Sequence, residues 1–321
     1  MFEIKKVKVR PESSPFFQFS KKSTLIRIGL FLMISLIISG MFFQLVSAKR
    51  IIHSQQLSEE YKEVMIDGSD IFIIIPSSPT HLERRNAIRH TWKKDLHANM
   101  NLTFFIGTKG LSRNNTWSLS LEEAVSKDII FLTDFEEKYS RLTEKMLTIY
   151  SFIAKKYKGI NWIFKTDSDV WLNPSLLQTS LSIPSSKTAL GKEFINAPVL
   201  TKGIYANLKY RGSKYPTYFS GAGYAISFDI VTWIAKQYDL NWLEPLPNED
   251  AAFGVWMAGT NIKMISIDKS ISDRKSNKVW NGTLSRCTKD TMLIHYLTPK
   301  SIYKAHTNFK KCHNPCKCSN K

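Results

Sequence analysis

Short apolar runs alternate with charged or amphipathic stretches through the middle of the chain. Residues 71–75, 102–106, 129–132 and 162–164 are almost entirely apolar, a pattern typical of strands buried on both faces. Residues 82–93, 119–127 and 141–156 predict helices, the last with Leu142, Met146, Ile149 and Ile153 on one face. Pro76 is expected to end the first strand. This alternation predicts an α/β fold with a mostly parallel central sheet.

A second apolar stretch, residues 28–48, differs from these runs in length. It contains 21 residues without a charge, about the length of helix that crosses a bilayer. Residues 1–27 carry a net charge of +5, which favours a cytosolic N-terminus. We therefore expect a cytosolic tail (1–27), a signal-anchor helix (28–48), a stem (49–69), a luminal domain (70–299) and a basic tail (300–321). The alternative is a cleaved signal peptide, since Ser47 and Ala48 resemble a cleavage site.

The formal net charge of +18 narrows the range of partners. Basic charge suits nucleic acid, an anionic membrane or an anionic small substrate. The single-pass type II topology argues against nucleic acid, because the lumen holds little of it. A nucleotide-sugar or an acidic glycan fits better, and a solvated basic surface is the plainer alternative for the lysines of the tail.

The cysteines and asparagines agree with a luminal location. The four cysteines are Cys287, Cys312, Cys316 and Cys318, which permit two disulfides in three pairings. We expect disulfides here rather than a metal knuckle, with Cys287 paired to Cys316 or Cys318. Candidate glycosylation triplets begin at Asn101, Asn114 and Asn281.

Two acids follow the fourth apolar run directly, in the stretch Lys165-Thr-Asp-Ser-Asp169. In parallel α/β sheets, ligands bind beyond the carboxyl ends of the strands. Asp167 and Asp169 are spaced so that both carboxylates can turn toward one divalent cation, which would also bind a substrate diphosphate. An acidic turn without a ligand is the plainer reading of the same spacing. No G-x-G-x-x-G or Walker loop is present.

Four other stretches carry candidate chemistry, each with a structural alternative. Arg85 and Arg89 share a helix face and suit a nucleotide or diphosphate, or else form a basic exposed surface. Residues 215–224 combine aromatic side chains with Gly221 and Gly223, which suits a sugar or a base, or a tight turn. Glu249 and Asp250 favour a helix N-terminus, or one is a general base. His295 is a core histidine or a nitrogen ligand for the metal. These candidates are read from the sequence.

Four ordered motifs in the chain resemble the β1,3-glycosyltransferase family, which includes β1,3-galactosyltransferases, β1,3-N-acetylglucosaminyltransferases and, more distantly, Fringe. They are "ERRNAIRHTW", "FKTDSDVWLN", "YPTYFSGAGYAIS" and "NEDAAFGVWMAG", within residues 71–299. The resemblance implies a GT-A fold, a UDP-sugar donor, Mn²⁺ as cofactor, inversion at the anomeric carbon and a Golgi membrane location. The implied reaction moves galactose or an N-acetylhexosamine to the 3-hydroxyl of a glycan on a glycoprotein or glycolipid.

The resemblance also assigns roles to single residues. Asp250 matches the proposed base, and Asp167, Asp169 and His295 match the metal ligands. The expected donor-binding residues are Arg85, Arg89, Lys165, Asp167, Ser168, Gly221, Gly223 and Glu249. The chain departs from the family pattern at Ser168, usually Asp, which puts metal affinity in question, and at Ala251, usually Val. A non-catalytic luminal chaperone or sugar-binding relative is the alternative, although the metal and base positions are all retained.

Overall fold

The computed structural model describes residues 70–203, 205–272 and 287–318. Its ten strands are β1 (Ile71–Ser77), β2 (Met100–Gly107), β3 (Ile129–Leu132), β4 (Trp162–Thr166), β5 (Trp171–Leu172), β6 (Thr188–Phe194), β7 (Tyr218–Ser227), β8 (Lys263–Ser266), β9 (Ile271–Ser272) and β10 (Leu293–Ile294). The α-helices described are α2 (Leu82–His90), α3 (Arg113–Ser126), α4 (Leu142–Lys156), α5 (Pro174–Ser180), α6 (Phe228–Asp239), α7 (Glu249–Met257) and α8 (Pro299–Cys312). Short 3₁₀ helices are η1 (Pro79–His81), η2 (Trp92–Asp95), η3 (Tyr139–Arg141) and η4 (Asp268–Ser270).

Seven of the strands form one sheet in the order β3-β2-β1-β4-β7-β6-β8. Every neighbouring pair is parallel except the two pairs made by β7, which runs antiparallel to β4 and β6. The prediction of a mostly parallel α/β sheet is therefore confirmed. The four predicted strands are β1 to β4, which are linked through helices as expected.

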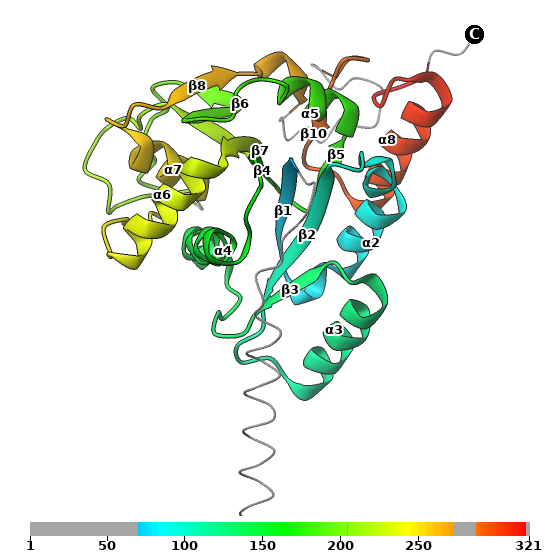
Figure 1. The fold of residues 1–321 in the computed structure, drawn as a ribbon, viewed down its shortest axis with the longest axis horizontal. Coiled ribbons are helices and arrows are strands. Elements are labelled where there is room, and N and C mark those ends of the chain that lie inside the picture. The colour runs from blue at the N-terminus through cyan, green and yellow to red at the C-terminus, as the bar shows by residue number, and fades with distance from the viewer. Residues whose placement is uncertain (1–69, 204, 273–286, 319–321) are drawn as a thin grey trace, which may run out of the picture. The chain divides into compact units, whose positions relative to one another are not determined.

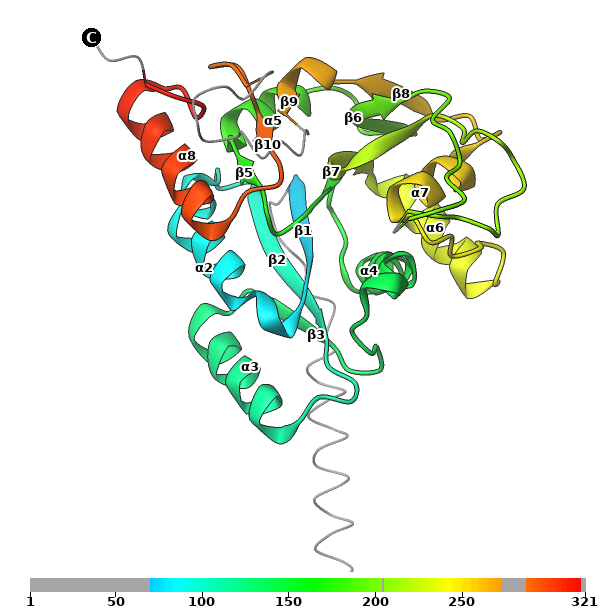
Figure 2. The ribbon, with the colours of Figure 1, turned by 180° about the vertical axis from the view of Figure 1, so that it is seen from behind.

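Helices cover both faces of this sheet (Figures 1 and 2). Alternate residues of β1 point to opposite faces: Ile71, Ile73 and Ile75 pack in one core cluster, and Phe72 and Ile74 pack in the other. The first cluster includes buried residues of α2, α3 and α8, whereas the second includes those of α4, α6 and α7. An apolar run without alternation thus corresponds to a strand that is buried on both sides.

Among the element boundaries that differ from the sequence prediction, two have a clear local cause. Pro76 does not end β1, which continues to Ser77. The pairing of β1 with β4 stops at Ile74, so at Pro76 only β2 remains as a partner and one fewer amide hydrogen bond is needed. Helix α3 begins at Arg113, earlier than predicted, because Ser112 caps it by accepting a hydrogen bond from the Asn115 amide at 3.3 Å.

The strand order places a topological switch between β1 and β4. The chain moves from β1 through β2 to β3 on one side, and then β4 adds to the opposite edge of β1. At such a point the connections leave β1 and β4 in opposite directions, and ligands of open α/β sheets bind beyond the strand ends there. The segment after β4 contains Asp167 and Asp169, so the fold itself indicates where to look for chemistry.

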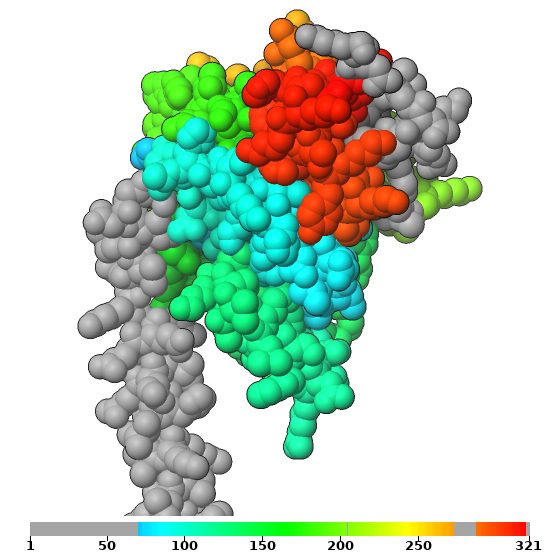
Figure 3. Space-filling model, turned by 90° about the vertical axis from the view of Figure 1, so that its right-hand side faces the viewer, coloured from blue at the N-terminus to red at the C-terminus, as the bar shows by residue number. Residues whose placement is uncertain are grey.

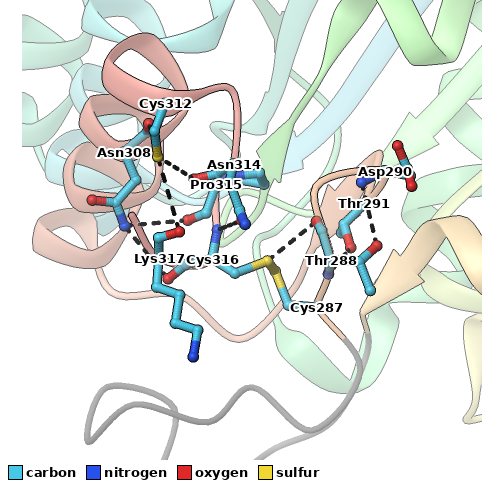
Figure 4. The surroundings of a disulfide bond; sticks show 10 residues. All are labelled: Cys287, Thr288, Asp290, Thr291, Asn308, Cys312, Asn314, Pro315, Cys316 and Lys317. Carbon is cyan, nitrogen blue, oxygen red and sulfur yellow. Dashed lines mark hydrogen bonds between the residues drawn. A yellow bond between two sulfur atoms is a disulfide. The ribbon is translucent and has the colours of Figure 1, made fainter. Parts of the chain in front are cut away.

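The C-terminal helix α8 packs against α2, as Figure 3 shows. Two disulfides lie near its C-terminal end, Cys287–Cys316 and Cys312–Cys318. The first joins the segment that leads into β10 to the chain after α8 (Figure 4). Cys316 and Cys318 are therefore not bonded to each other, and Cys287 has one of the two expected partners.

Several sequence predictions concern residues outside the described ranges. The tail 1–27, the signal-anchor 28–48, the stem 49–69 and Asn281 all lie there. Among the residues that the structure describes, no helix combines the length and apolar character needed to cross a bilayer. Of the other two glycosylation candidates, Asn101 lies in β2 and Asn114 in α3, and both side chains are exposed.

Candidate active site

The acidic turn follows the buried end of β4. All five residues of β4 are buried, and the turn to β5 then contains Asp167 and Asp169, whose side chains are 29% and 18% exposed. Ser168 between them is buried. The two carboxylates therefore face accessible space at the end of a rigid strand, whereas the middle residue faces the protein.

A small second sheet brings His295 to these acids. Strands β5 and β10 pair antiparallel, with Ile294 opposite Trp171, and β9 pairs on the other side of β10. The Leu297 amide donates to the Asp169 carbonyl at 2.9 Å, which extends this pairing past His295. As a result, His295 Nε2 lies 3.4 Å from Asp167 Oδ2 and 3.2 Å from Asp169 Oδ1.

These three side chains fit a divalent cation. One ligand atom from each of Asp167, Asp169 and His295 lies within 4.8 Å of the others. Two carboxylates and an imidazole offer the oxygen and nitrogen donors that Mn²⁺ accepts. Partial burial acts to raise the pKa of Asp167, but Lys165 and His295 outweigh it and hold that pKa well below the usual range. The carboxylate is therefore ionised and available as a ligand at neutral pH.

Lys165 is buried beneath the acids and connects them to α7. Its ammonium group donates to Asp167 Oδ1 at 3.0 Å and to the Gly221 carbonyl at 2.7 Å, and it lies 3.0 Å from Glu249 Oε2. Burial lowers the pKa of Lys165, but the two carboxylates outweigh this effect and raise it above its ordinary value. The charge is thus kept inside the protein by two anions.

Glu249 is the buried partner in this network. Its side chain is 5% exposed, and its second oxygen accepts a hydrogen bond from the Tyr224 hydroxyl at 2.6 Å. The hydroxyls of Tyr224 and Tyr150 lie 2.9 Å apart. Glu249 is therefore held by groups from β4 and β7, and it has a fixed structural position.

Asp250 is the next residue on α7, and its environment is different. It is only half-buried, and its carboxylate accepts backbone hydrogen bonds from Ala251 at 2.8 Å and from Gly221 at 3.3 Å. Its burial and then the nearby charge of Glu249 raise the pKa of Asp250 to about 6. A carboxylate with this pKa is ionised at neutral pH. It is also basic enough to take a proton from a hydroxyl group whose oxygen is reacting as a nucleophile.

Comparison with known proteins decides the family. A sequence profile described as galactosyltransferase matches residues 83–268, which include the acidic turn, Glu249 and Asp250. The chain belongs to the galactosyltransferase family. The resemblance to β1,3-glycosyltransferases inferred from the four motifs is thereby confirmed.

Individual relatives in this family are more distant. A UDP-GalNAc:beta-1,3-N-acetylgalactosaminyltransferase 1 from Mus musculus is 29% identical over 199 residues, which are 58% of this chain and 58% of the relative. The human protein of the same name is also 29% identical over 199 residues. A UDP-GalNAc:beta-1,3-N-acetylgalactosaminyltransferase 2 from Xenopus tropicalis is 23% identical over 206 residues, 63% of this chain and 39% of the relative. The chain thus covers well under two thirds of each relative's length.

Two of the predicted donor-binding residues of this galactosyltransferase-family chain lie apart from the acids. Arg85 is fully buried and makes a bidentate pair with Glu122 of α3, with both distances 2.7 Å. Arg89 lies beside it and pairs with Glu122 and Asp128. Both guanidinium groups therefore join α2 to the α3 region, and the structure does not bring them to Asp167 and Asp169.

A neighbouring arginine takes the position that the sequence analysis gave to Arg85 and Arg89. Arg84 Nη1 lies 3.5 Å from Asp169 Oδ2, and its side chain is 36% exposed. His81 Nδ1 lies 3.5 Å from the Ser168 hydroxyl. Because Arg84 and Arg85 are adjacent, their sequence context is almost the same. Arg85 instead donates to Glu122, to the Ser77 hydroxyl and to the Ser78 carbonyl, and nothing in the local sequence signals its contact with Glu122.

The two glycines of β7 have different roles. Gly221 contributes backbone groups: its amide donates to Asp250, and its carbonyl accepts from Lys165. A side chain at Gly223 would collide with Leu293, since a Cβ there would lie 2.6 Å from Leu293 Cδ1. Leu293 belongs to β10, so Gly223 leaves room for the strand that leads to His295. The close approach predicted at these glycines therefore involves the protein's own groups.

Proposed function

We propose that this protein is an inverting, metal-dependent glycosyltransferase of the Golgi membrane. It has a GT-A-type fold, and it moves a hexose from a UDP-sugar to the 3-hydroxyl of an acceptor glycan. The observation that carries this proposal is that Lys165 connects a candidate metal cluster to a candidate base. Its ammonium group contacts Asp167 of the cluster and the Gly221 carbonyl. The Gly221 amide in turn donates to Asp250, a carboxylate with a raised pKa.

The donor diphosphate would bind at the cluster. Asp167, Asp169 and His295 would hold Mn²⁺, which neutralises the diphosphate and stabilises UDP as a leaving group. Arg84 adds a positive charge beside Asp169 and is partly exposed, so its guanidinium can also contact a phosphate oxygen. Lys165 stays buried and keeps Asp167 in place beneath the phosphates.

Asp250 would act on the acceptor. Its carboxylate takes the proton from the acceptor 3-hydroxyl while that oxygen attacks the anomeric carbon, and the bond from this carbon to the diphosphate breaks. The backbone amides of Gly221 and Ala251 fix the carboxylate during this step. Attack from the side opposite to the departing UDP inverts the anomeric configuration. Glu249 cannot replace Asp250, because its oxygens already contact Lys165 and Tyr224.

A donor screen tests the proposal directly. The full chain, purified in detergent, is incubated with Mn²⁺ and UDP-galactose, UDP-N-acetylglucosamine or UDP-N-acetylgalactosamine, and UDP release is measured with and without β-hexoside acceptors. The names of the relatives make UDP-N-acetylgalactosamine the first donor to try. We expect release that chelation abolishes. No release from any of the three donors would contradict the proposal and favour a non-catalytic relative.

The topology has its own test. If residues 28–48 anchor the chain with its C-terminal part in the lumen, the exposed Asn101 and Asn114 are accessible to the glycosylation machinery. Glycosidase treatment of protein from cells should then reduce its apparent mass. Asn→Gln replacement of these two residues together with the third candidate, Asn281, should remove this shift. A chain without glycans whose C-terminus is cytosolic would contradict the predicted orientation.

A further inference from the structure

One buried lysine near the end of β6 has no acidic partner. Of the lysines that the structure describes, three are buried: Lys145, Lys165 and Lys192. The first two each contact a carboxylate at 3.0 Å or less. Lys192 is 7% exposed, and in the described part of the chain no carboxylate pairs with it. A lysine is seldom buried without a partner, because burial disfavours its charged form.

The ammonium group of Lys192 is directed toward the C-terminal end of β6. Its Nζ lies 5.9 Å from the centre of the Phe194 ring, two residues closer to that end. This ring stacks on Tyr218, the first residue of β7, with the centroids 5.2 Å apart. Among the described side chains, the enclosed polar atoms without a hydrogen-bond partner are Trp171 Nε1 and His306 Nδ1. The Lys192 ammonium group therefore reaches solvent beside the Phe194 ring.

The strand pairing places Lys192 close to the proposed base. The register of β6 with β7 shifts at Lys192, which therefore lies opposite residues 220–223. Within that segment, Gly221 donates its amide to Asp250 and accepts from Lys165. Neighbouring strands are about 4.8 Å apart. The backbone of Lys192 is thus about one strand spacing from the residue that holds the base.

The connection between β6 and β7 carries only positive charge. Residues 195–217 include four cations and no aspartate or glutamate. All four cations are exposed, and they are Lys202, Lys209, Arg211 and Lys214. Lys209 pairs with Glu244 at 3.2 Å. The other three have no acidic partner in the described part of the chain, so they can meet an anion from outside.

This basic connection is fixed beside α7, as Figures 1 and 2 show. The side chain of Asn248, which directly precedes α7, donates to the Tyr205 carbonyl at 3.1 Å. Pro198 and Lys214 form an antiparallel bridge that closes the connection on itself. The exposed cations therefore belong to an ordered segment that contacts the start of the helix carrying Asp250.

An anionic group on the acceptor fits Lys192 better than a neutral sugar does. A hydroxyl can be bound by neutral donors, which are less costly to bury than an ammonium group. A carboxylate or sulfate supplies the missing counter-ion and forms charge-assisted hydrogen bonds. The donor diphosphate is a less suitable partner, because β7 separates β6 from β4, the strand that leads to the metal cluster.

We propose that Lys192 and the exposed cations of the β6–β7 connection bind an acceptor glycan that carries carboxylate or sulfate groups. This inference rests on the proposed glycosyltransferase function and names its acceptor class. An anionic group near the reacting sugar pairs with Lys192. Groups further along the glycan meet Lys202, Arg211 and Lys214. The acceptor is thus bound by opposite charge on the β6 side of Asp250, and the donor on the β4 side.

The experiment compares charged and neutral glycans of equal length. The probes are fluorescent hexasaccharides of keratan sulfate, which carries sulfates, of its desulfated form, which is neutral, and of unsulfated chondroitin, which carries carboxylates. Fluorescence anisotropy with the full chain in detergent, Mn²⁺ and UDP measures the Kd of each probe at physiological salt. UDP release from the three UDP-sugars is measured separately without any probe.

Two variants and one control remove positive charge from different places. One variant replaces Lys202, Arg211 and Lys214 together by glutamine, and the other is Lys192→Met. The control removes the same number of charges from α8 and the segment after it, where three lysines are exposed. It replaces Lys300, Lys311 and Lys317 by glutamine.

We expect the wild type to bind one of the charged probes at least about tenfold more tightly than the neutral probe. Preference for keratan sulfate identifies sulfate as the bound group, and preference for chondroitin identifies carboxylate. Each variant should lose most of this preference, whereas the control should keep it. High salt should weaken the preference of the wild type, because salt screens the exposed charges. Lys192→Met should not lower the urea midpoint, because no internal partner loses its counter-ion.

Three results would overturn the inference: equal affinity of the wild type for charged and neutral probes, a preference that either variant keeps in full, or an equal loss in the control. The last would show that binding follows net charge alone. A wild type that releases no UDP from any donor but keeps a preference that depends on Lys192 would refute the catalytic function and leave the anion site standing. UDP release together with equal binding of all probes would refute the anion site alone.

Discussion

Replacing Lys165 by methionine should destabilise the protein strongly. Lys165 is 1% exposed, and its ammonium group contacts Asp167, Glu249 and the Gly221 carbonyl at 2.7 to 3.0 Å. Methionine fills a similar volume but removes the charge. Asp167 is 29% exposed and can be solvated, whereas Glu249 is 5% exposed and would retain only the Tyr224 hydroxyl. Removing one partner of a buried ion pair costs about 3–5 kcal/mol, so we expect a loss of that size.

Equilibrium unfolding in urea with EDTA measures this loss without a contribution from bound metal. At a slope of about 3 kcal/mol per molar, the midpoint should fall by about 1–2 M. The matched control is Lys155→Met, because Lys155 pairs with Asp239 on the surface, with the two side chains 58% and 48% exposed. That exposed pair should be worth less than about 1 kcal/mol.

A second change tests the cause of the loss. In the Lys165→Met background, Glu249→Gln removes the unpaired charge but still accepts a hydrogen bond from Tyr224. The double variant should therefore be more stable than Lys165→Met alone, with a coupling energy of about 1–3 kcal/mol. A Lys165→Met variant that loses less than about 1 kcal/mol, or a double variant as unstable as the sum of the single changes, would refute the view that Glu249 is held by this charge.

The remaining predictions concern the reaction. Asp250→Asn should abolish sugar transfer while UDP binding, measured by calorimetry, is unchanged. Because the pKa of Asp250 is raised to about 6 and the base must be ionised, kcat/KM of the wild type should be level above that pH and fall about tenfold per unit below it; a flat profile down to pH 5 would exclude Asp250 as the base. His295→Ala removes one of three ligand atoms, so Mn²⁺ affinity measured by electron paramagnetic resonance should fall by more than about tenfold. Arg84→Met should raise the donor KM with little change in the urea midpoint. Arg85→Met should lower stability by about 1–3 kcal/mol, because the Ser77 hydroxyl and the Ser78 carbonyl lose their donor and Glu122 keeps only Arg89 as a partner; equal effects of the two changes on stability would contradict this distinction.

The sheet could be predicted from the sequence, because its signals are local. The apolar runs matched β1 to β4, and residues 129–132 matched β3 at both ends. A strand buried on both faces needs apolar side chains at nearly every position, so it appears in the sequence as an uninterrupted apolar run. The start of α3 was not predicted, because its first turns are exposed and mostly polar. Apolar residues therefore do not recur there at the spacing of a helix.

The pairing of β5 with β10 could not be predicted. Each strand has two residues, too few to show a period. That pairing nevertheless determines the distance between Asp169 and His295. The residue types of the metal cluster were therefore visible in the sequence, whereas its geometry depends on a long-range contact. The roles of Arg84 and Arg85 were indistinguishable for the same reason, since Glu122 approaches one of them from another helix.

The two adjacent acids at the start of α7 show why position in the fold decides chemistry. Neighbouring residues on a helix project about 100° apart, so the two carboxylates of Glu249 and Asp250 point in different directions. Glu249 turns inward and pairs with the buried ammonium group of Lys165. Asp250 stays half-exposed, and the charge of Glu249 helps to raise its pKa toward neutrality. Lys165 opposes that effect, and so the same buried pair that stabilises the site also limits how far the pKa of the base can rise. Loss of Lys165 should therefore move the acidic limb of the kcat/KM profile to higher pH as well as destabilise the fold.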